Sequence, residues 1–211
     1  MAARAELTAP GFRRAASELA AHDDVLGSIV ERHGFPAFWA RPAGFSTLLL
    51  LILEQQVSLA SARAAFNRVD ARVGGVTPEA LLRLSDGELR EDGFSRQKAG
   101  YARALAGAIV ERTLDLDALR DLDDASVRTA LVQLPGIGPW TAEVYLLSAL
   151  RRPDTWPTGD LALQEATRMA LSLPARPSPV ELESIGERWR PHRATAARLL
   201  WHHYLSERGR G

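Results

Sequence analysis

The chain contains no cysteine. This absence excludes a disulfide framework, a cysteine nucleophile and any cluster held by thiolates. Lysine is almost as scarce, because Lys98 is the only one and arginine supplies all the other basic side chains. A reaction that needs a lysine amine therefore has one side chain to draw on.

Long apolar runs are also absent. The longest, Leu48–Leu53, stops at Glu54, whereas a membrane-spanning helix needs about 20 apolar residues. The first residues (AARAEL after Met1) lack the apolar region of a signal peptide. We therefore expect a cytoplasmic protein, nucleoid-associated if the source is bacterial.

The charges balance, with a formal net charge of zero at pH 7. This gives the whole chain no electrostatic preference for nucleic acid, which proteins bind largely through basic side chains. Acidic residues gather between 115 and 124, however, and the C-terminal segment 186–211 is basic, so it can present a positive face. Its arginines are Arg188, Arg190, Arg193, Arg198, Arg208 and Arg210.

Apolar residues recur at helical spacing along nearly the whole chain, which predicts an all-α protein of about ten helices. The segment 45–56 is apolar almost all round and predicts a central buried helix. Thr77 and Ser85 read as caps of short helices, the second with a capping box. The other expected helices span 15–33, 58–73, 95–112, 125–134, 140–151, 161–173, 179–189 and 194–207.

Residues 134–142 (LPGIGPWTA) join two of these helices through a tight turn. Gly136 and Gly138 leave the amides of the turn uncovered by Cβ atoms. Ile137 between them can point into the core. The next helix begins at once, and its unpaired N–H groups suit a phosphate. The pattern predicts a helix-hairpin-helix, although an ordinary helix–helix turn could carry the same glycines.

A carboxylate, Asp160, lies twenty positions beyond Trp140, after a loop of proline and glycine. As the residue before an expected helix it can serve as an N-cap. A carboxylate can also stabilise a developing positive charge and orient or deprotonate a water molecule. The two roles are compatible.

Four blocks of the sequence, in order, resemble the HhH-GPD superfamily of DNA glycosylases, in its AlkA-type 3-methyladenine DNA glycosylase II branch. They are 52–58 (ILEQQVS), 93–99 (GFSRQKA), 134–142 with Asp160, and 189–196 (WRPHRATA) running into Trp201. The resemblance implies two helical lobes with the hairpin at the DNA-binding cleft. Residues 36–150, with the hairpin at 126–150, would form the central lobe, and 1–35 would pack with 151–211. A chain of this length would lack the β-rich N-terminal domain of the longest members.

The resemblance implies a monomeric, monofunctional glycosylase of base excision repair. Its substrates would be alkylated bases, such as 3-methyladenine and 7-methylguanine, flipped out of double-stranded DNA. Bifunctional members use a lysine directly after the hairpin, where this chain has Trp140. The iron–sulfur cluster of other branches needs cysteines and is excluded. No other cofactor is expected, apart from a Na⁺ or K⁺ at the hairpin.

The resemblance assigns the family's functional roles to the matching positions of this chain. Asp160 would be catalytic, and the substrate pocket would hold the residues Trp140, Trp201, Val144 and Tyr145, with Phe38 and Trp39 as further aromatic candidates. The DNA-binding residues would be Gln55, Gln56, Gly136, Ile137, Gly138 and Thr141, with Gln56 as the wedge. The carbonyls that would hold the cation belong to Val132, Leu134 and Ile137.

The chain departs from the family pattern at Glu54, where members usually have glycine. This places a negative charge near the DNA-facing end of a helix. Val144 stands where some relatives carry a pocket tyrosine. Two other functions stay open at this point: a non-catalytic DNA-binding module that uses the hairpin alone, and a glycosylase for deaminated or oxidised bases.

Overall fold

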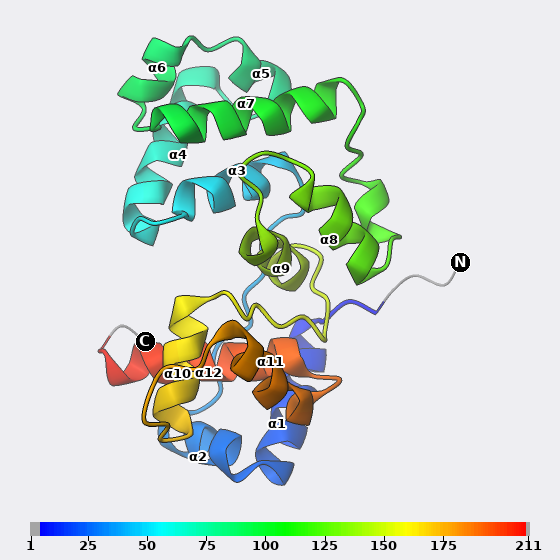
Figure 1. Ribbon diagram of the computed structural model, residues 1–211, viewed down its shortest axis with the longest axis vertical. Helices are drawn as coiled ribbons and strands as arrows, with labels where there is room; N and C mark the ends of the chain where they lie inside the picture. Colours follow the sequence, from blue (N-terminus) through cyan, green and yellow to red (C-terminus); the bar gives the residue numbers. More distant parts are fainter. Residues whose placement is uncertain (1–4, 210–211) are drawn as a thin grey trace. The chain divides into compact units, whose positions relative to one another are not determined.

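The computed structural model describes residues 5–209, and every regular element in that range is helical (Figure 1). The all-α prediction is confirmed. No helix of this part of the chain is both long and apolar enough to span a membrane. Residues 1–4 of the expected lobe 1–35 lie outside the described range, as does Arg210 of the basic segment.

Backbone contacts divide the chain into two units, Met1–Ala40 with Leu146–Gly211, and Arg41–Tyr145. The sequence places the corresponding boundaries at 36 and 150. The unit Arg41–Tyr145 is built around α3, which the sequence predicts to be buried: the side chains from Thr47 to Leu53 are all at most 5% exposed. The elements of this unit are α3 (Phe45–Glu54), α4 (Leu59–Val73), α5 (Pro78–Leu82), α6 (Asp86–Glu91), α7 (Arg96–Val110), η1 (Ala118–Arg120), α8 (Asp124–Val132) and most of α9 (Pro139–Ser148).

The other unit packs its helices around α12, whose residues Ala194, Ala196, Ala197, Leu199 and Leu200 are fully buried. Helices α2 and α10 both pack against α12. The elements of this unit are α1 (Ala9–His22), α2 (Asp24–His33), the end of α9, α10 (Leu161–Ala170), α11 (Pro179–Gly186), η2 (Glu187–Trp189) and α12 (Arg193–Glu207).

The caps predicted at Thr77 and Ser85 are confirmed, and two further serines also cap helices. Ser58, Thr77 and Ser178 accept hydrogen bonds from the first turns of α4, α5 and α11. Ser85 and Glu88 form the predicted capping box of α6. These caps show that residues a few positions apart are sufficient to position a helix start.

The single helix expected over 15–33 is wrong. The chain starts a helix earlier, at Ala9, and breaks it at Asp23, where φ is −133° and ψ is 109°. The Asp23 carboxylate caps α2 through the N–H groups of Val25 (3.1 Å) and Leu26 (3.0 Å). Trp189 donates its indole N–H to the same carboxylate at 2.9 Å. The break therefore depends on a residue far away in the sequence.

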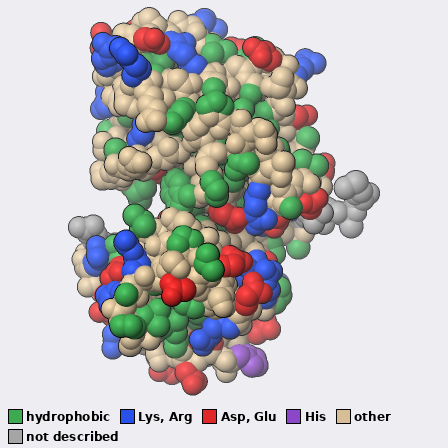
Figure 2. Space-filling model, in the orientation of Figure 1, with side chains coloured by type: hydrophobic (Ala, Val, Ile, Leu, Met, Phe, Trp, Pro, Cys, Tyr) green, Lys and Arg blue, Asp and Glu red, His purple; other side chains and the backbone are tan. Residues whose placement is uncertain are grey.

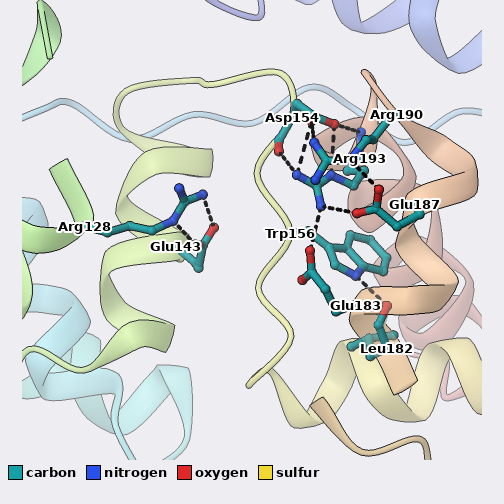
Figure 3. A network of polar contacts seen from close by, with 9 residues as sticks. All are labelled: Arg128, Glu143, Asp154, Trp156, Leu182, Glu183, Glu187, Arg190 and Arg193. Atoms are coloured by element: carbon teal, nitrogen blue, oxygen red, sulfur yellow. Dashed lines mark hydrogen bonds and ion pairs between the residues drawn. The ribbon is translucent and has the colours of Figure 1, made fainter. Parts of the chain in front are cut away.

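The helix expected over 179–189 also divides, into α11 and η2 at Gly186. A Cβ at Gly186 would lie 2.4 Å from Nε1 of Trp156. The indole needs this space because it donates a 2.8 Å hydrogen bond to the carbonyl of Leu182 (Figure 3). Close packing against Trp156 therefore requires glycine at position 186.

A network of carboxylates surrounds Arg193, whose side chain is 7% exposed (Figure 3). Its guanidinium lies 3.0 Å from Asp154 and 2.9 Å from Glu183. Arg190 pairs with Asp154 at 2.6 Å and with Glu187 at 2.8 Å. A buried guanidinium needs such partners, because an unpaired charge is costly to bury.

The basic C-terminal segment is consequently less available to phosphate than the sequence suggests. Arg190 and Arg193 belong to the carboxylate network, Arg188 pairs with Asp23 at 2.5 Å, and Arg198 is buried. Figure 2 shows acidic and basic side chains interspersed on the face in view. Four of its six arginines thus have partners within the fold, and a positive face built from this segment stays a prediction.

Candidate active site and nucleic-acid interface

The hairpin turn lies between α8, which ends at Val132, and α9, which begins at Pro139. Gly136 has a φ of +84°, and a Cβ there would lie 2.2 Å from the Tyr101 ring. Ile137 is 4% exposed, so it anchors the turn in the core as predicted. A Cβ at Gly138 would meet nothing within 4 Å. The turn therefore needs Gly136 for packing and leaves open space beside Gly138.

Gln55 ties the end of α3 to this hairpin. Its side-chain amide donates to the carbonyl of Gly136 at 2.7 Å and to the hydroxyl of Thr141 at 3.1 Å. Thr141 is 1% exposed. The structure thus gives the side chains of Gln55 and Thr141 a positioning role within the protein, beneath the expected DNA-binding surface.

Lys98 closes the end of α3. Its ammonium group donates to the carbonyls of Leu53 at 2.7 Å and Gln55 at 2.8 Å. These are among the last carbonyls of the helix, which have no partner within it. Burial lowers the pKa of Lys98. This role was not predicted, although two signals pointed to it: Lys98 is the only lysine, and the apolar helix 45–56 ends in carbonyls that need donors.

Gln56 follows directly and is exposed, with a φ of +57°. Such a left-handed conformation is uncommon for residues other than glycine and costs free energy. The bonds that Lys98 and Gln55 make on its N-terminal side hold the chain at this point. The predicted wedge is therefore an exposed side chain on a well-anchored backbone.

Glu54, which stands where members of the family usually have glycine, forms an ion pair with Arg41. Arg41 donates to both of its carboxylate oxygens at 3.0 Å, and the Glu54 side chain is only 6% exposed. A bidentate pair of this kind is geometrically specific and neutralises the carboxylate. The negative charge expected to oppose phosphate is compensated within the same unit.

Asp160 is the N-cap of α10, as predicted. Its Oδ1 accepts hydrogen bonds from the backbone N–H of Leu163 at 2.7 Å and from the indole N–H of Trp201, on α12, at 3.0 Å. The side chain remains partly exposed. Two donors from two helices thus fix the orientation of this carboxylate.

The Trp201 ring packs against a second tryptophan, Trp39, whose own ring lies beside the guanidinium of the buried Arg198. The ring centroids of Trp39 and Trp201 are 6.0 Å apart, and the Arg198 guanidinium lies 4.9 Å from the Trp39 ring. Arg198 is 1% exposed and donates to the carbonyl of Leu147 at 2.9 Å. Burial lowers the pKa of Arg198 to about 10, so it stays charged at neutral pH. The contact between Arg198 and the Trp39 ring was not predicted from the sequence.

Tyr145 is corrected from a pocket residue to a core residue. It has no exposed surface, and its hydroxyl accepts a 3.0 Å hydrogen bond from the N–H of Gly44. Burial raises its pKa. Val144 is also buried, at 6% exposed, while Trp140 is half-buried near the start of α9. Pocket roles for Val144 and Trp140 stay predictions.

Comparison with known proteins identifies the wider group. The model of the HhH-GPD superfamily of base excision DNA repair proteins matches residues 49–191. A putative DNA-3-methyladenine glycosylase of Bacillus subtilis, YfjP, is 29% identical over 83% of this chain and 64% of its own length. A probable bifunctional transcriptional activator/DNA repair enzyme AlkA of Mycobacterium tuberculosis is 37% identical over 71% of this chain and 31% of its own length. The chain thus spans less than two thirds of these two relatives.

Solved structures agree over most of the chain. Schizosaccharomyces pombe 3-methyladenine DNA glycosylase (Mag1), in complex with abasic DNA, aligns with a TM-score of 0.82 and 26% identity, over 89% of this chain and 95% of that one. A DNA-3-methyladenine glycosidase of Bacillus halodurans aligns with a TM-score of 0.79 and 30% identity, over 92% and 91%. The fold prediction is confirmed.

Proposed function

Because the chain belongs to the HhH-GPD superfamily of base excision DNA repair proteins, we propose that it is a monofunctional DNA glycosylase. It hydrolyses the N-glycosidic bond of alkylated bases, such as 3-methyladenine and 7-methylguanine, in double-stranded DNA. The observation that carries the proposal is Asp160, whose Oδ1 is fixed by Leu163 and Trp201. The protein acts as a cytoplasmic monomer.

Asp160 supplies the chemistry in this proposal. A base in a duplex must first be flipped out of the stack. A base alkylated at N3 or N7 carries positive charge, so it leaves as a neutral molecule when its bond to C1′ breaks. The sugar then develops positive charge, which the Asp160 carboxylate stabilises. Water adds to C1′, and the carboxylate accepts its proton.

The product is an intact abasic site. A lyase step needs an amine that attacks C1′, and Trp140 stands where bifunctional members of the superfamily have lysine. The amine of Lys98 is committed to the carbonyls of Leu53 and Gln55. Hydrolysis by water leaves no covalent link between protein and sugar.

The DNA backbone is held in this proposal by the amides of the turn at Gly136–Gly138, with Gln56 as the wedge. Val132 is the last residue of α8, and terminal carbonyls of a helix have no partner within it. The Leu134 carbonyl accepts one bond, from Ile137, and keeps a second lone pair. Neutral oxygens of this kind fit Na⁺ or K⁺. The ion would place positive charge beside a phosphate.

The test is release of modified bases from methylated duplex DNA by the full chain. We expect Asp160→Asn to lower the rate by at least ~10²-fold, on the scale of one electrostatic stabiliser, while binding to abasic DNA is kept. Asp24→Asn, in the exposed first turn of α2, is the matched control and should release bases normally.

The other outcomes are equally specific. DNA binding without release of any base would make the protein a non-catalytic binding module. Release from duplexes with deaminated or oxidised bases, but not from methylated ones, would overturn the substrate class. Near-normal release by Asp160→Asn would overturn the role of the carboxylate.

A further inference from the structure

Helix α2 packs against α12 in the same unit (Figure 1). Two histidines and a glutamate from these helices converge there. His33 is the last residue of α2, and His203 and Glu207 are one turn apart on α12. Their side chains are 13%, 11% and 33% exposed. All three belong to the unit that also contains Asp160, yet none of them takes part in the proposed reaction.

The three potential ligand atoms form a compact triangle. Nε2 of His33 lies 3.2 Å from Nδ1 of His203 and 3.2 Å from Oε1 of Glu207, and the third side, from His203 to Glu207, is 3.9 Å. A point equidistant from three atoms at these separations lies about 2.0 Å from each. Bonds from Zn²⁺ to imidazole nitrogen and to carboxylate oxygen are about 2.0–2.2 Å long. The triangle therefore matches one ion without movement of the side chains.

We propose that His33, His203 and Glu207 bind a divalent transition-metal ion, and that Zn²⁺ is the ion that fits best. Imidazole and carboxylate ligands are suited to zinc, and no thiolate is needed. The ion links the end of α2 to α12 across 170 residues of sequence. This inference does not depend on the proposed glycosylase activity.

The surroundings support the proposal. His203 and Arg32 line a hollow of about 400 Å³, which leaves room for water as a further ligand. His202 lies 3.1 Å from the carbonyl of His33 through its Nε2. Such outer contacts orient the ligands of a metal site.

Arg32 offers a competing explanation for Glu207. Its guanidinium lies 3.0 Å from the same oxygen, Oε1, and its side chain is 67% exposed. An ion pair at so exposed a position contributes little to stability. It does not explain why one ring nitrogen of His33 and one of His203 also lie within 3.9 Å of that oxygen. Removal of Arg32 therefore separates an ion pair from a metal site.

The experiment uses the full chain without an affinity tag, freed of metal with a chelator. Co²⁺ is titrated at neutral pH and followed by its visible absorption, then displaced by Zn²⁺. We expect one ion per chain, and a loss of affinity of at least ~10-fold in both Glu207→Gln and His203→Gln, since even outer-shell changes cost 10–100-fold. His192→Gln, a histidine of the same segment outside the triangle, and Arg32→Ala should bind normally.

A thermal melt gives a readout independent of colour. Zn²⁺ should raise the melting temperature of the wild type and of His192→Gln, because a ligand that binds the folded state stabilises it. It should leave the melting temperature of Glu207→Gln unchanged. If His203→Gln fails to fold, Glu207→Gln still decides, since its side chain is partly exposed. No binding by the wild type, equal binding by Glu207→Gln, or loss of binding in Arg32→Ala would overturn the proposal.

Discussion

The indole N–H of Trp201 donates a 3.0 Å hydrogen bond to Oδ1 of Asp160. The same oxygen accepts from the backbone of Leu163, at the start of α10. The sequence predicts Trp201 as a substrate-pocket residue, where its ring can stack on a base, but its N–H also fixes the direction of the carboxylate. Trp201 is therefore a positioning residue for Asp160, whatever its ring contacts.

Trp201→Phe separates the two roles, because phenylalanine keeps an aromatic face and loses the N–H. We expect kcat for base release to fall by about 10-fold, less than the ~10²-fold that removal of a direct stabiliser costs, with KM nearly unchanged. Tyr204→Phe, on the same helix but outside the candidate site, is the control and should keep kcat. A rise in KM with kcat unchanged would mean that Trp201 acts only by stacking.

Lys98 is expected to support structure and not to attack the sugar. Borohydride should trap no protein–DNA adduct during turnover, and strand breaks should appear only after alkali or heat. Lys98→Met should lower the free energy of unfolding by about 1–3 kcal/mol, because two carbonyls of α3 lose their charged donor. Denaturant unfolding measures this change. An adduct formed by the wild type and lost in the variant would contradict the monofunctional reaction.

Most of the helices could be predicted from residues that are close together in the sequence. The caps at Ser58, Thr77, Ser85 and Ser178 and the buried helix α3 were all predictable, since each depends on residues a few positions apart. The break at Asp23 was not, because the apolar period continues through it. What favours the break is a hydrogen bond from Trp189, 166 residues away.

The same distinction applies to the candidate site. Asp160 as an N-cap follows from its neighbours, whereas its bond to Trp201 joins residues 41 positions apart. The hydrogen bond from Gln55 to Gly136 joins residues 81 positions apart, and the pairing of Arg41 with Glu54 joins residues 13 positions apart. Motif matching identified these residues except Arg41, but only the structure separates side chains that face outward from those that hold others in place.

The hairpin offers a matched pair of glycines. Gly136→Ala should destabilise the protein, because its Cβ would overlap the Tyr101 ring and φ is +84°. Gly138→Ala should fold normally, since its Cβ enters open space, and should weaken binding to undamaged and damaged duplexes alike by obstructing approach of the DNA backbone. Thermal melts and DNA-binding titrations measure the two effects. Unchanged DNA affinity in a folded Gly138→Ala would contradict the role of this turn.

Asp23 should make the stability of its unit depend on pH. Burial by itself raises the pKa of Asp23, but hydrogen bonds from Leu26, Trp189 and Arg188 outweigh it and hold the pKa below 3.8, its ordinary value. A carboxyl group with a lowered pKa in the folded state stabilises that state above its unfolded pKa, and the contribution is lost as pH falls through the folded pKa. Asp23→Asn should therefore cost about 1–3 kcal/mol at neutral pH, the value of hydrogen bonds to a charged group.

This cost should shrink as the pH of denaturant titrations is lowered below 3.8. Asparagine still caps a helix well, so the variant removes the charge and the bonds from Trp189 and Arg188 more than the cap itself. Asp24→Asn, one residue later and exposed, should change stability less and show no such convergence. If the difference between wild type and Asp23→Asn stayed constant down to the acid limit of folding, the charge of Asp23 would not be what stabilises the break between α1 and α2.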